Sequence, residues 1–266
     1  MDPATFYRTH PVFTLEEAQR ALADSRSTHP RAIRSLLTNH VQRGKLLRVR
    51  QGLFAVVPSG IDSDRYPVDP LLIAGCLADD VVISFYAALE YHGKAYSVQH
   101  TYVVQSSHRI RELVFQSHTF TQVSFPKALS STAKEHLATR MEDRQGRSIR
   151  LATLERALVD CLHQPRLGGG WEEIWRSFEA VEFFDLELLV DYALAVGTAT
   201  TVAKVGFFLQ QHREALMVDD ATLKRLQEAA PKQPQYLERD RPGKLVASWN
   251  LVVPPALLER NWEQVL

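Results

Sequence analysis

The chain has 266 residues, of which 45% are hydrophobic and 23% charged, and its 31 basic residues balance 31 acidic ones. A chain of this size can bury a sizeable core, and its length favours about two domains. We find no basic start followed by an apolar run and no apolar stretch of about 18 residues, so we expect a cytoplasmic protein without a secretion signal or membrane span. Cys76 and Cys161 lie in apolar contexts, which indicates buried thiols rather than a disulfide or a thiolate metal site.

The balanced net charge hides an asymmetry along the chain. Residues 1–57 hold nine basic and four acidic residues, and residues 58–266 hold 22 and 27, so the two parts carry net charges of +5 and −5. Between them lies the turn-rich stretch PSGIDSDRYPVDP, whose prolines and glycine are typical of a linker. We therefore predict a first domain over residues 1–57, a linker over 58–69 and a second domain over 70–266.

The first domain is predicted to form two helices followed by a hairpin. Thr14 and Glu17 form a capping box ahead of an apolar stripe, which predicts a helix over residues 15–24. A proline suits the first turn of a second helix over residues 30–43, and Gly44 is well placed to terminate it. Two short β-like runs follow, LLRV and LFAVV, joined by a tight RQG turn. This order predicts a winged helix-turn-helix.

The second predicted helix and the hairpin carry a one-sided charge. Residues 28–52 contain six basic residues and no acidic one. On a helical wheel Ile33, Leu36 and His40 share one side, so His40 is expected to be a partly buried structural histidine, while arginines and hydroxyls gather opposite. A carboxylate-free face of this kind suits a DNA major groove, since arginine forks match phosphates and guanine edges. A solvated basic face without a partner is the alternative interpretation.

Eleven residues are therefore predicted to contact DNA. Arg31 and Arg34 are assigned to the major groove, and Arg48 and Arg50 to the phosphate backbone beside the hairpin. The full set is Arg26, Ser27, His29, Arg31, Arg34, Ser35, Thr38, Lys45, Arg48, Arg50 and Gln51.

After the linker the pattern changes from mixed to helical. Asp69 and Pro70 predict the start of a helix, VVIS predicts a short buried strand, and Ser84 is placed to cap the next helix. Strand-like runs cover residues 97–105, 112–116, 119–125 and 148–152, and helical runs cover 153–162, 171–181, 186–196, 201–212 and about 221–229. A late strand near residues 247–253 is placed to return to the sheet. We predict an α+β fold with an N-terminal winged helix-turn-helix, a mixed α/β region and a C-terminal helical bundle.

Residues 58–266 show no recognised motif for catalysis or for a metal or cofactor. They lack G-x-x-x-x-G-K-[ST], H-E-x-x-H and paired C-x-x-C, and the glycines at 168–170 suit a helix connection better than an anion site. Glu155 and Asp160 are expected to point to different sides of one helix, which makes an acid pair improbable. An aromatic stripe at helical spacing favours core packing over a nucleotide platform, and it marks a partner surface if it is exposed: Trp171, Trp175 and Phe178. We expect no catalytic residue, no metal and no cofactor.

Two runs are distinctive in their order behind a winged helix: YPVDPLLIAGCLADDVVISFYAALEYHG and RLATLERALVDCLHQPRLGGGWEEIWRSFE. They resemble the AbiEi family of antitoxins from bacterial type IV toxin-antitoxin and phage abortive-infection loci. The resemblance covers nearly the whole chain, from the winged helix through GFFLQQHRE to WNLVVP. The resemblance implies a repressor of its own operon that also counters a nucleotidyltransferase-like toxin without a stable complex with it.

The partner predicted from the residues themselves is double-stranded operator DNA. One winged helix buries too little surface for tight specific binding, so we expect repeated half-sites occupied by two chains. The charge split predicts that residues 1–57 suffice for DNA contact. Together with the family resemblance, it predicts that residues 59–266 suffice to protect a cell from the toxin. Two alternatives stay open: an enzyme that modifies the toxin, such as a kinase or nucleotidyl-modifying activity, and an ordinary ligand-sensing transcription factor.

Overall fold

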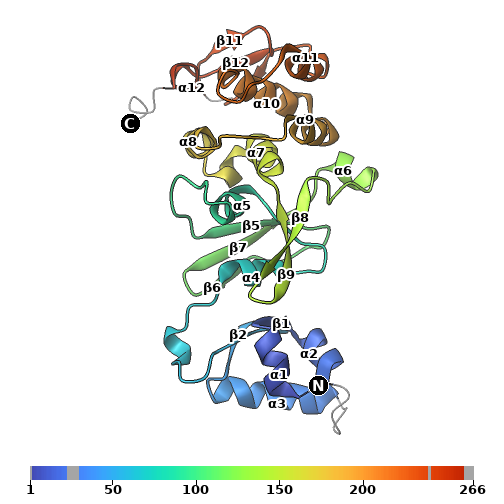
Figure 1. Ribbon diagram of the computed structural model, residues 1–266, viewed down its shortest axis with the longest axis vertical. Helices are drawn as coiled ribbons and strands as arrows, with labels where there is room; N and C mark the ends of the chain where they lie inside the picture. The colour runs from blue at the N-terminus through green and yellow to red at the C-terminus, as the bar shows by residue number, and fades with distance from the viewer. Residues whose placement is uncertain (1, 23–29, 239–240, 261–266) are drawn as a thin grey trace. The chain divides into compact units, whose positions relative to one another are not determined.

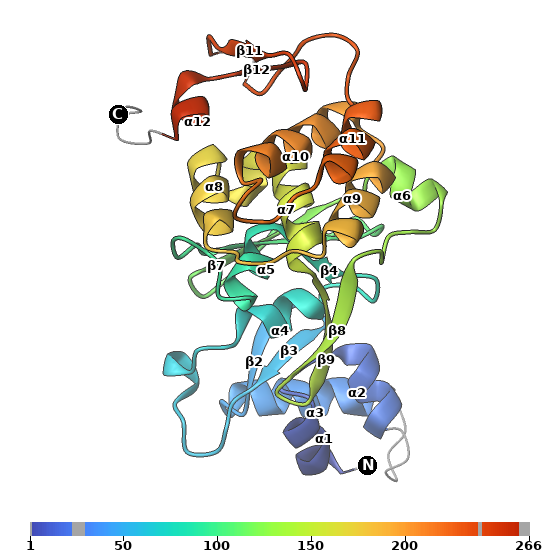
Figure 2. The same ribbon diagram turned by 45° about the horizontal axis from the view of Figure 1, so that its top comes forward.

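The computed structural model describes residues 2–22, 30–238 and 241–260 (Figures 1 and 2). Its fold is of the α+β class, as predicted. Contacts divide the chain into two compact units. Unit 1 comprises Met1–Ile83, His100–Val123 and Met141–Leu151, and unit 2 comprises Ser84–Gln99, Ser124–Arg140 and Ala152–Leu266. No helix in the described ranges is long and apolar enough to cross a bilayer.

The N-terminal part of unit 1 joins three helices to a small sheet. In chain order the elements are α1 (Pro3–Thr9), β1 (Val12–Thr14), α2 (Leu15–Leu22), α3 (Pro30–Gln42), β2 (Leu46–Arg50) and β3 (Leu53–Val56). β3 lies between β1 and β2 and pairs antiparallel with both. The helices gather on one side of this sheet (Figure 1). They share a buried core with it: Phe6, Phe13, Ala18, Leu22, Ile33, Leu37, Leu46 and Phe54.

Local sequence signals set the boundaries of α2 and α3. The predicted capping box is confirmed, because the Thr14 amide donates to Glu17 Oε2 at 2.7 Å and the Glu17 amide donates to Thr14 Oγ1 at 3.2 Å. The described part of α2 ends at Leu22, and the predicted continuation through residues 23 and 24 lies outside the described residues. α3 ends just before Gly44, whose φ of +67° is the left-handed conformation that terminates helices.

Helix α1 was not predicted, although its start carries an ordinary signal. Oδ1 of Asp2 accepts hydrogen bonds from the amides of Ala4 and Thr5, and Pro3 occupies the first turn. The helix is only seven residues long, so it shows too little apolar periodicity to be recognised.

A mixed six-stranded sheet follows, most of which belongs to unit 1. Its strand order is β6-β7-β5-β4-β9-β8. β5 runs parallel to β7, and β4 runs parallel to β9 but antiparallel to β5. Its strands are β4 (Val82–Ile83), β5 (Thr101–Gln105), β6 (Leu113–Phe115), β7 (His118–Val123), β8 (Thr139–Arg144) and β9 (Arg147–Ala152). A 3-10 turn, η1 (Ser63–Arg65), and α4 (Pro70–Gly75) precede it, and Asp69 caps α4 as predicted by accepting from the Leu71 amide at 2.9 Å.

Strand β8 was not predicted from the sequence. Its residues, TRMEDR, comprise two arginines, two acids, one threonine and one methionine, so they show no hydrophobic alternation. β8 is an edge strand of the sheet. Edge strands tolerate and often carry charges, because charges there discourage pairing with another chain.

Unit 2 is mainly helical (Figure 2). Its helices are α5 (Phe85–Tyr91), α6 (Lys127–Ser131), α7 (Leu154–His163), α8 (Trp171–Glu179), α9 (Leu186–Ala195), α10 (Ala199–Gln211), α11 (Asp220–Glu228) and α12 (Pro255–Glu259), with a 3-10 turn η2 (Pro165–Gly168). The five helices predicted between residues 153 and 229 are confirmed as α7 to α11, each with ends shifted by at most two residues. Helix α7 packs against α5, α9 and α10.

The late strand exists, but its expected return to the large sheet is wrong. β12 (Leu251–Val253) pairs instead with β10 (Gln235–Tyr236) and β11 (Lys244–Val246) in a separate three-stranded sheet. Trp249, fully buried just before β12, lies so close to Gly206 of α10 that a Cβ at that glycine would collide with its ring. The indole therefore packs the segment before β12 against α10. No local sequence pattern predicts this long-range contact.

Candidate functional site

The outer face of α3 carries the main set of predicted DNA-contacting side chains. Arg31, Arg34, Ser35 and Thr38 are exposed, whereas Ile33 is only 5% exposed and Leu37 is fully buried on the other side of the helix. The predicted separation of polar and apolar faces is confirmed. The face presents two guanidinium groups and two hydroxyls on one rigid element.

Three of the predicted residues precede α3 and have no described position. Arg26, Ser27 and His29 lie outside the described residues.

The hairpin residues do not all lie in one kind of environment. Arg48 and Gln51 are exposed, and the Arg48 guanidinium lies 5.9 Å from the centre of the Phe54 ring. Arg50 is half-buried, and its Nη2 donates to the Leu77 carbonyl at 2.7 Å. Burial lowers the pKa of Arg50 from its ordinary value. Arg48 and Gln51 thus face solvent, whereas Arg50 is bonded to another part of unit 1.

His40 of α3 and Lys45, which lies between α3 and β2, line a groove and do not belong to the exposed arginine face. His40 is half-buried and shares a 2.8 Å hydrogen bond through Nδ1 with the Tyr7 hydroxyl, which confirms the prediction of a structural histidine. Burial, and then the charges of Lys45 and Arg43, lower the pKa of His40. The ring is therefore held in its neutral form at neutral pH.

The N-terminal elements also contact the region after the linker. Arg147 Nη2 lies 2.7 Å from Glu17 Oε1, and the Cys76 thiol donates to the Val12 carbonyl at 3.8 Å. Burial raises the pKa of Glu17, but the Thr14 amide and Arg147 outweigh this effect, so the pKa lies below its ordinary value. Residues 1–57 are thus joined to the sheet region within unit 1. Whether they also fold alone, as the division at residue 57 requires, remains a prediction.

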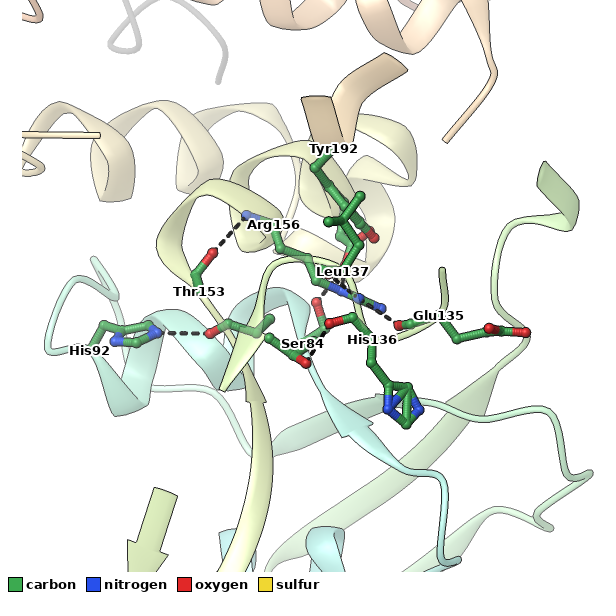
Figure 3. Close-up of polar contacts among 11 residues, drawn as sticks. Ser84, His92, Glu135, His136, Leu137, Thr153, Arg156 and Tyr192 are labelled. Atoms are coloured by element: carbon green, nitrogen blue, oxygen red, sulfur yellow. Dashed lines mark hydrogen bonds and ion pairs between the residues drawn. The ribbon is translucent and has the colours of Figure 1, made fainter. Parts of the chain in front are cut away.

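A buried polar cluster in unit 2 centres on Asp160 of α7. Figure 3 shows three of its members, Ser84, Arg156 and Tyr192. Its Oδ2 accepts from the Ser84 hydroxyl at 2.6 Å and from Arg156 Nε at 3.3 Å, and its Oδ1 accepts from the Tyr192 hydroxyl at 2.8 Å. Arg156 Nη1 donates at 2.7 Å to two carbonyls, those of Glu135 and Leu137.

The same cluster corrects the role predicted for Ser84. The residue does occupy the position before α5, but its side chain makes no capping hydrogen bond and instead donates to Asp160. The following residue, Phe85, is fully buried and has a φ of +55°, an unusual backbone conformation for a bulky side chain. The start of α5 is therefore held by a long-range contact within unit 2 and not by a local cap.

The buried cluster is better suited to stabilise the fold than to perform chemistry. Ser84, Arg156, Asp160 and Tyr192 are each at most 1% exposed, so no substrate reaches them in this state. Glu155 lies elsewhere and accepts from the Asp185 amide at 3.0 Å, so the expected separation of Glu155 and Asp160 is confirmed. Breaking a buried, fully paired charge network costs several kcal/mol, roughly 3 to 5 when one partner is removed.

Other candidate sites have structural roles. The aromatic stripe of α8 is buried, so the core interpretation is confirmed: Trp171, Trp175 and Phe178 are 9%, 0% and 1% exposed. The glycines at 168–170 connect α7 to α8 through η2, and Gly169 and Gly170 have φ values of +87° and +92°. Within the described ranges, no group of three or more His, Cys, Asp or Glu residues is arranged to hold a metal ion.

Comparisons with known proteins show a fold and no function. No protein-family model and no curated protein sequence matches the chain. The structure is similar to the crystal structure of the RV2827C protein from Mycobacterium tuberculosis, with a TM-score of 0.60 and 14% sequence identity. The match covers 97% of this chain and 92% of that protein. At this identity the likeness shows a shared fold over nearly the whole length and nothing more.

Proposed function

We propose that the chain is a DNA-binding antitoxin that represses its own operon and in which residues 1–57 act as a winged helix-turn-helix. The order α1, β1, α2, α3, β2, β3 supports this interpretation, with two helices in succession followed by a two-stranded hairpin. In this assignment α3 is the recognition helix, and the hairpin is the wing.

The observation that carries the DNA-binding proposal is the outer face of α3. Arg34 and Thr38 are exposed on the side opposite Leu37, so the helix can enter a major groove without disturbing the core. Arginine reads guanine edges and phosphates through bidentate hydrogen bonds, and hydroxyls bond either bases or phosphates. A surface without carboxylates also allows release of the counterions condensed on the duplex.

The hairpin is expected to contribute less to DNA binding than its two arginines suggest. Arg48 is exposed and available to a phosphate, but Arg50 is engaged with the Leu77 carbonyl. We therefore assign base reading to α3 and a sequence-independent phosphate contact to Arg48. Arg50 then acts by holding the hairpin in place.

The antitoxin half of the proposal rests on the resemblance to the AbiEi family. In this proposal the acidic remainder of the chain counters a nucleotidyltransferase-like toxin without forming a stable complex with it. The net charge of −5 over residues 58–266 is consistent with a task other than binding nucleic acid. The family resemblance places the toxin gene beside this one, so its presence there is the first observation to make.

The experiment that tests DNA binding titrates the full chain against DNA from upstream of its own gene. We expect an affinity roughly 1000-fold or more above that for unrelated DNA, and two chains on each operator with repeated half-sites. Fluorescence anisotropy gives the affinity, and native mass spectrometry gives the number of chains. Equal affinity for both DNAs would refute a specific repressor, and one chain on one undivided site at every concentration would refute the half-site arrangement.

The antitoxin activity needs a separate experiment in cells. The full chain, expressed from an unrelated promoter, is expected to restore growth to cells that produce the neighbouring toxin. Affinity purification of the chain from the same cells is expected to recover no toxin. Failure to restore growth at verified expression would refute the antitoxin role, whatever the outcome of the DNA experiment.

A further inference from the structure

A groove of about 1100 Å³ lies beside α3, entirely within unit 1. Its walls come from α1, the C-terminal half of α3, the base of the hairpin and the segment after it. Small-molecule sites commonly occupy about 300 to 1000 Å³, so this groove has room for a ligand of that size.

Three basic side chains line the groove without a carboxylate partner. Arg8, Arg43 and Lys45 form no ion pair with any described acidic residue. The one carboxylate in the lining, Asp2, has its Oδ1 occupied by two amides at the start of α1. The lining therefore carries three basic groups against one carboxylate, and this net positive charge attracts anions.

The remaining lining combines apolar side chains with groups that form hydrogen bonds. Leu36 and Val56 are half-buried, and Ile61 is 47% exposed at the rim. The Tyr7 hydroxyl and His40 Nδ1 form a bonded pair on the same wall. Burial raises the pKa of Tyr7 to about 12, so its phenol remains neutral and can bond a ligand at physiological pH.

We infer that this groove binds a small organic anion that has a carboxylate or phosphate-type head and an apolar ring or acyl body. The head would pair with Arg43 and Lys45, since charge-assisted hydrogen bonds to an anion are strong and directional. The body would cover Ile61 and the neighbouring apolar wall. A DNA backbone fits this lining less well, because it has charge but no apolar body to place there.

The position of the groove gives such a ligand a route to regulation. Leu36 and His40 lie on the groove side of α3, and Arg43 directly follows the helix. Arg34 and Thr38 lie on its outer face. A ligand that contacts α1 and α3 together would bias the orientation of α3 and so change the affinity of the chain for DNA. Because such coupling is reciprocal, bound DNA would change the affinity for the ligand by the same factor. This regulatory step rests on the proposed DNA binding, but ligand binding itself does not.

The test uses 8-anilinonaphthalene-1-sulfonate, a probe with an anionic head and an aromatic body that fluoresces in apolar surroundings. The full chain without DNA is expected to bind the probe saturably at one site. The Arg43→Ala/Lys45→Ala double variant is expected to bind about ten-fold or more weakly. A matched control, Arg109→Ala/Arg111→Ala, removes the same charge from exposed residues of unit 1 outside the groove and is expected to bind like the wild type.

A second variant keeps the test decisive if the double variant unfolds. Ile61→Glu places a carboxylate at an exposed position of the groove, outside the core. Because this charge repels an anionic probe, the variant is expected to weaken probe binding by a similar factor. Benzoate and phenyl phosphate are then compared as competitors, and the better competitor identifies the preferred head. Non-saturable binding, or equal binding by the wild type and both groove variants, overturns the inference. Displacement of the probe by DNA but by neither small anion overturns it as well.

Failure of this inference and failure of the proposed function are distinguishable. The probe experiment contains no DNA, so its outcome does not depend on operator binding. Operator affinity is measured separately with and without the better competitor. If the anion binds but operator affinity does not change, the groove is still a binding site and its regulatory role is refuted.

Discussion

The Ser84 hydroxyl lies 2.6 Å from Oδ2 of Asp160, although 76 positions separate the two residues in the chain. Both side chains are fully buried. The contact ties the start of α5 to the middle of α7, and Tyr192 adds α9 through the other carboxylate oxygen. One carboxylate therefore joins three helices of unit 2.

The Asp160→Asn variant is expected to lower the free energy of unfolding by about 3 kcal/mol. The amide keeps the shape of the carboxylate but loses the charge opposite Arg156. Its NH₂ group replaces one of the two oxygens and so faces the hydroxyl of either Ser84 or Tyr192, each of which donates to an oxygen in the wild type. Urea denaturation followed by circular dichroism measures the effect. The control is Asp191→Asn on α9, whose exposed ion pair with Arg225 should contribute less than about 1 kcal/mol. Equal stability of the two variants would contradict a central role for Asp160.

The contrast between Asp160 and Thr14 shows which features the sequence can predict. The capping box of Thr14 and Glu17 involves residues three positions apart, so a local pattern reveals it. Arg156 lies four positions before Asp160 on the same helix, but Ser84 and Tyr192 lie 76 and 32 positions away. These two distant partners depend on tertiary packing, and no local pattern indicates them. The faces of α3 were predictable because helical periodicity separates core from solvent, but the Arg50 contact with Leu77 spans 27 positions and was not.

Lys204 predicts a specific pH dependence of stability. Burial lowers its pKa from 10.5 to about 8, and its Nζ donates to the Leu162 carbonyl at 2.9 Å. Between pH 8 and pH 10.5 the unfolded chain holds the proton and the folded chain releases it, so this residue makes stability rise with pH across that window. At neutral pH the buried charge therefore costs stability.

Replacing Lys204 with methionine is expected to stabilise the protein by about 2 kcal/mol at pH 7. The variant should also lack the part of the rise between pH 8 and pH 10.5 that Lys204 contributes, so its advantage over the wild type should shrink across this window. Thermal or urea unfolding at several pH values measures both effects. Lys224→Met on α11 is the control, because Lys224 is exposed. A constant difference between wild type and Lys204→Met at every pH would show that the lysine does not titrate in this window.

The Arg31→Ala/Arg34→Ala double variant is expected to lose operator binding. Each arginine that reads a base is worth roughly 1 to 3 kcal/mol, and each phosphate contact adds about one unit to the salt slope. Anisotropy titrations at several salt concentrations separate these contributions. The Arg109→Ala/Arg111→Ala variant removes equal charge elsewhere in unit 1 and should bind the operator normally. Unchanged binding by the α3 variant, with its fold intact, would refute the assignment of the recognition helix.

Arg48 and Arg50 are expected to respond differently to the same substitution. Arg48→Ala removes an exposed charge, so it should weaken binding to all DNA sequences alike. It should also lower the slope of log affinity against log salt concentration by about one unit. Arg50→Ala removes the donor to the Leu77 carbonyl, so it should lower stability by about 1 to 3 kcal/mol. Melting curves and DNA titrations of both variants make the comparison. Equal stability of the two variants would contradict the anchoring role of Arg50.

Repression and protection from the toxin are expected to be separable within the full chain. The Arg31→Ala/Arg34→Ala variant should fail to repress a reporter under its own operator, yet it should protect cells from the toxin as well as the wild type does. The reason is that the proposed DNA contacts lie on the outer face of α3, while the acidic remainder of the chain is unchanged.

Substitution tests this separation more cleanly than truncation does. Residues 59–266 alone are also expected to protect, but that fragment deletes Glu17 and Arg50 and so leaves Arg147 and the Leu77 carbonyl without their partners. A failure of the fragment could then reflect lost stability, which circular dichroism and melting would reveal. If the folded full-length α3 variant loses protection together with repression, the antitoxin effect acts through DNA, and the proposal of two separate tasks is wrong.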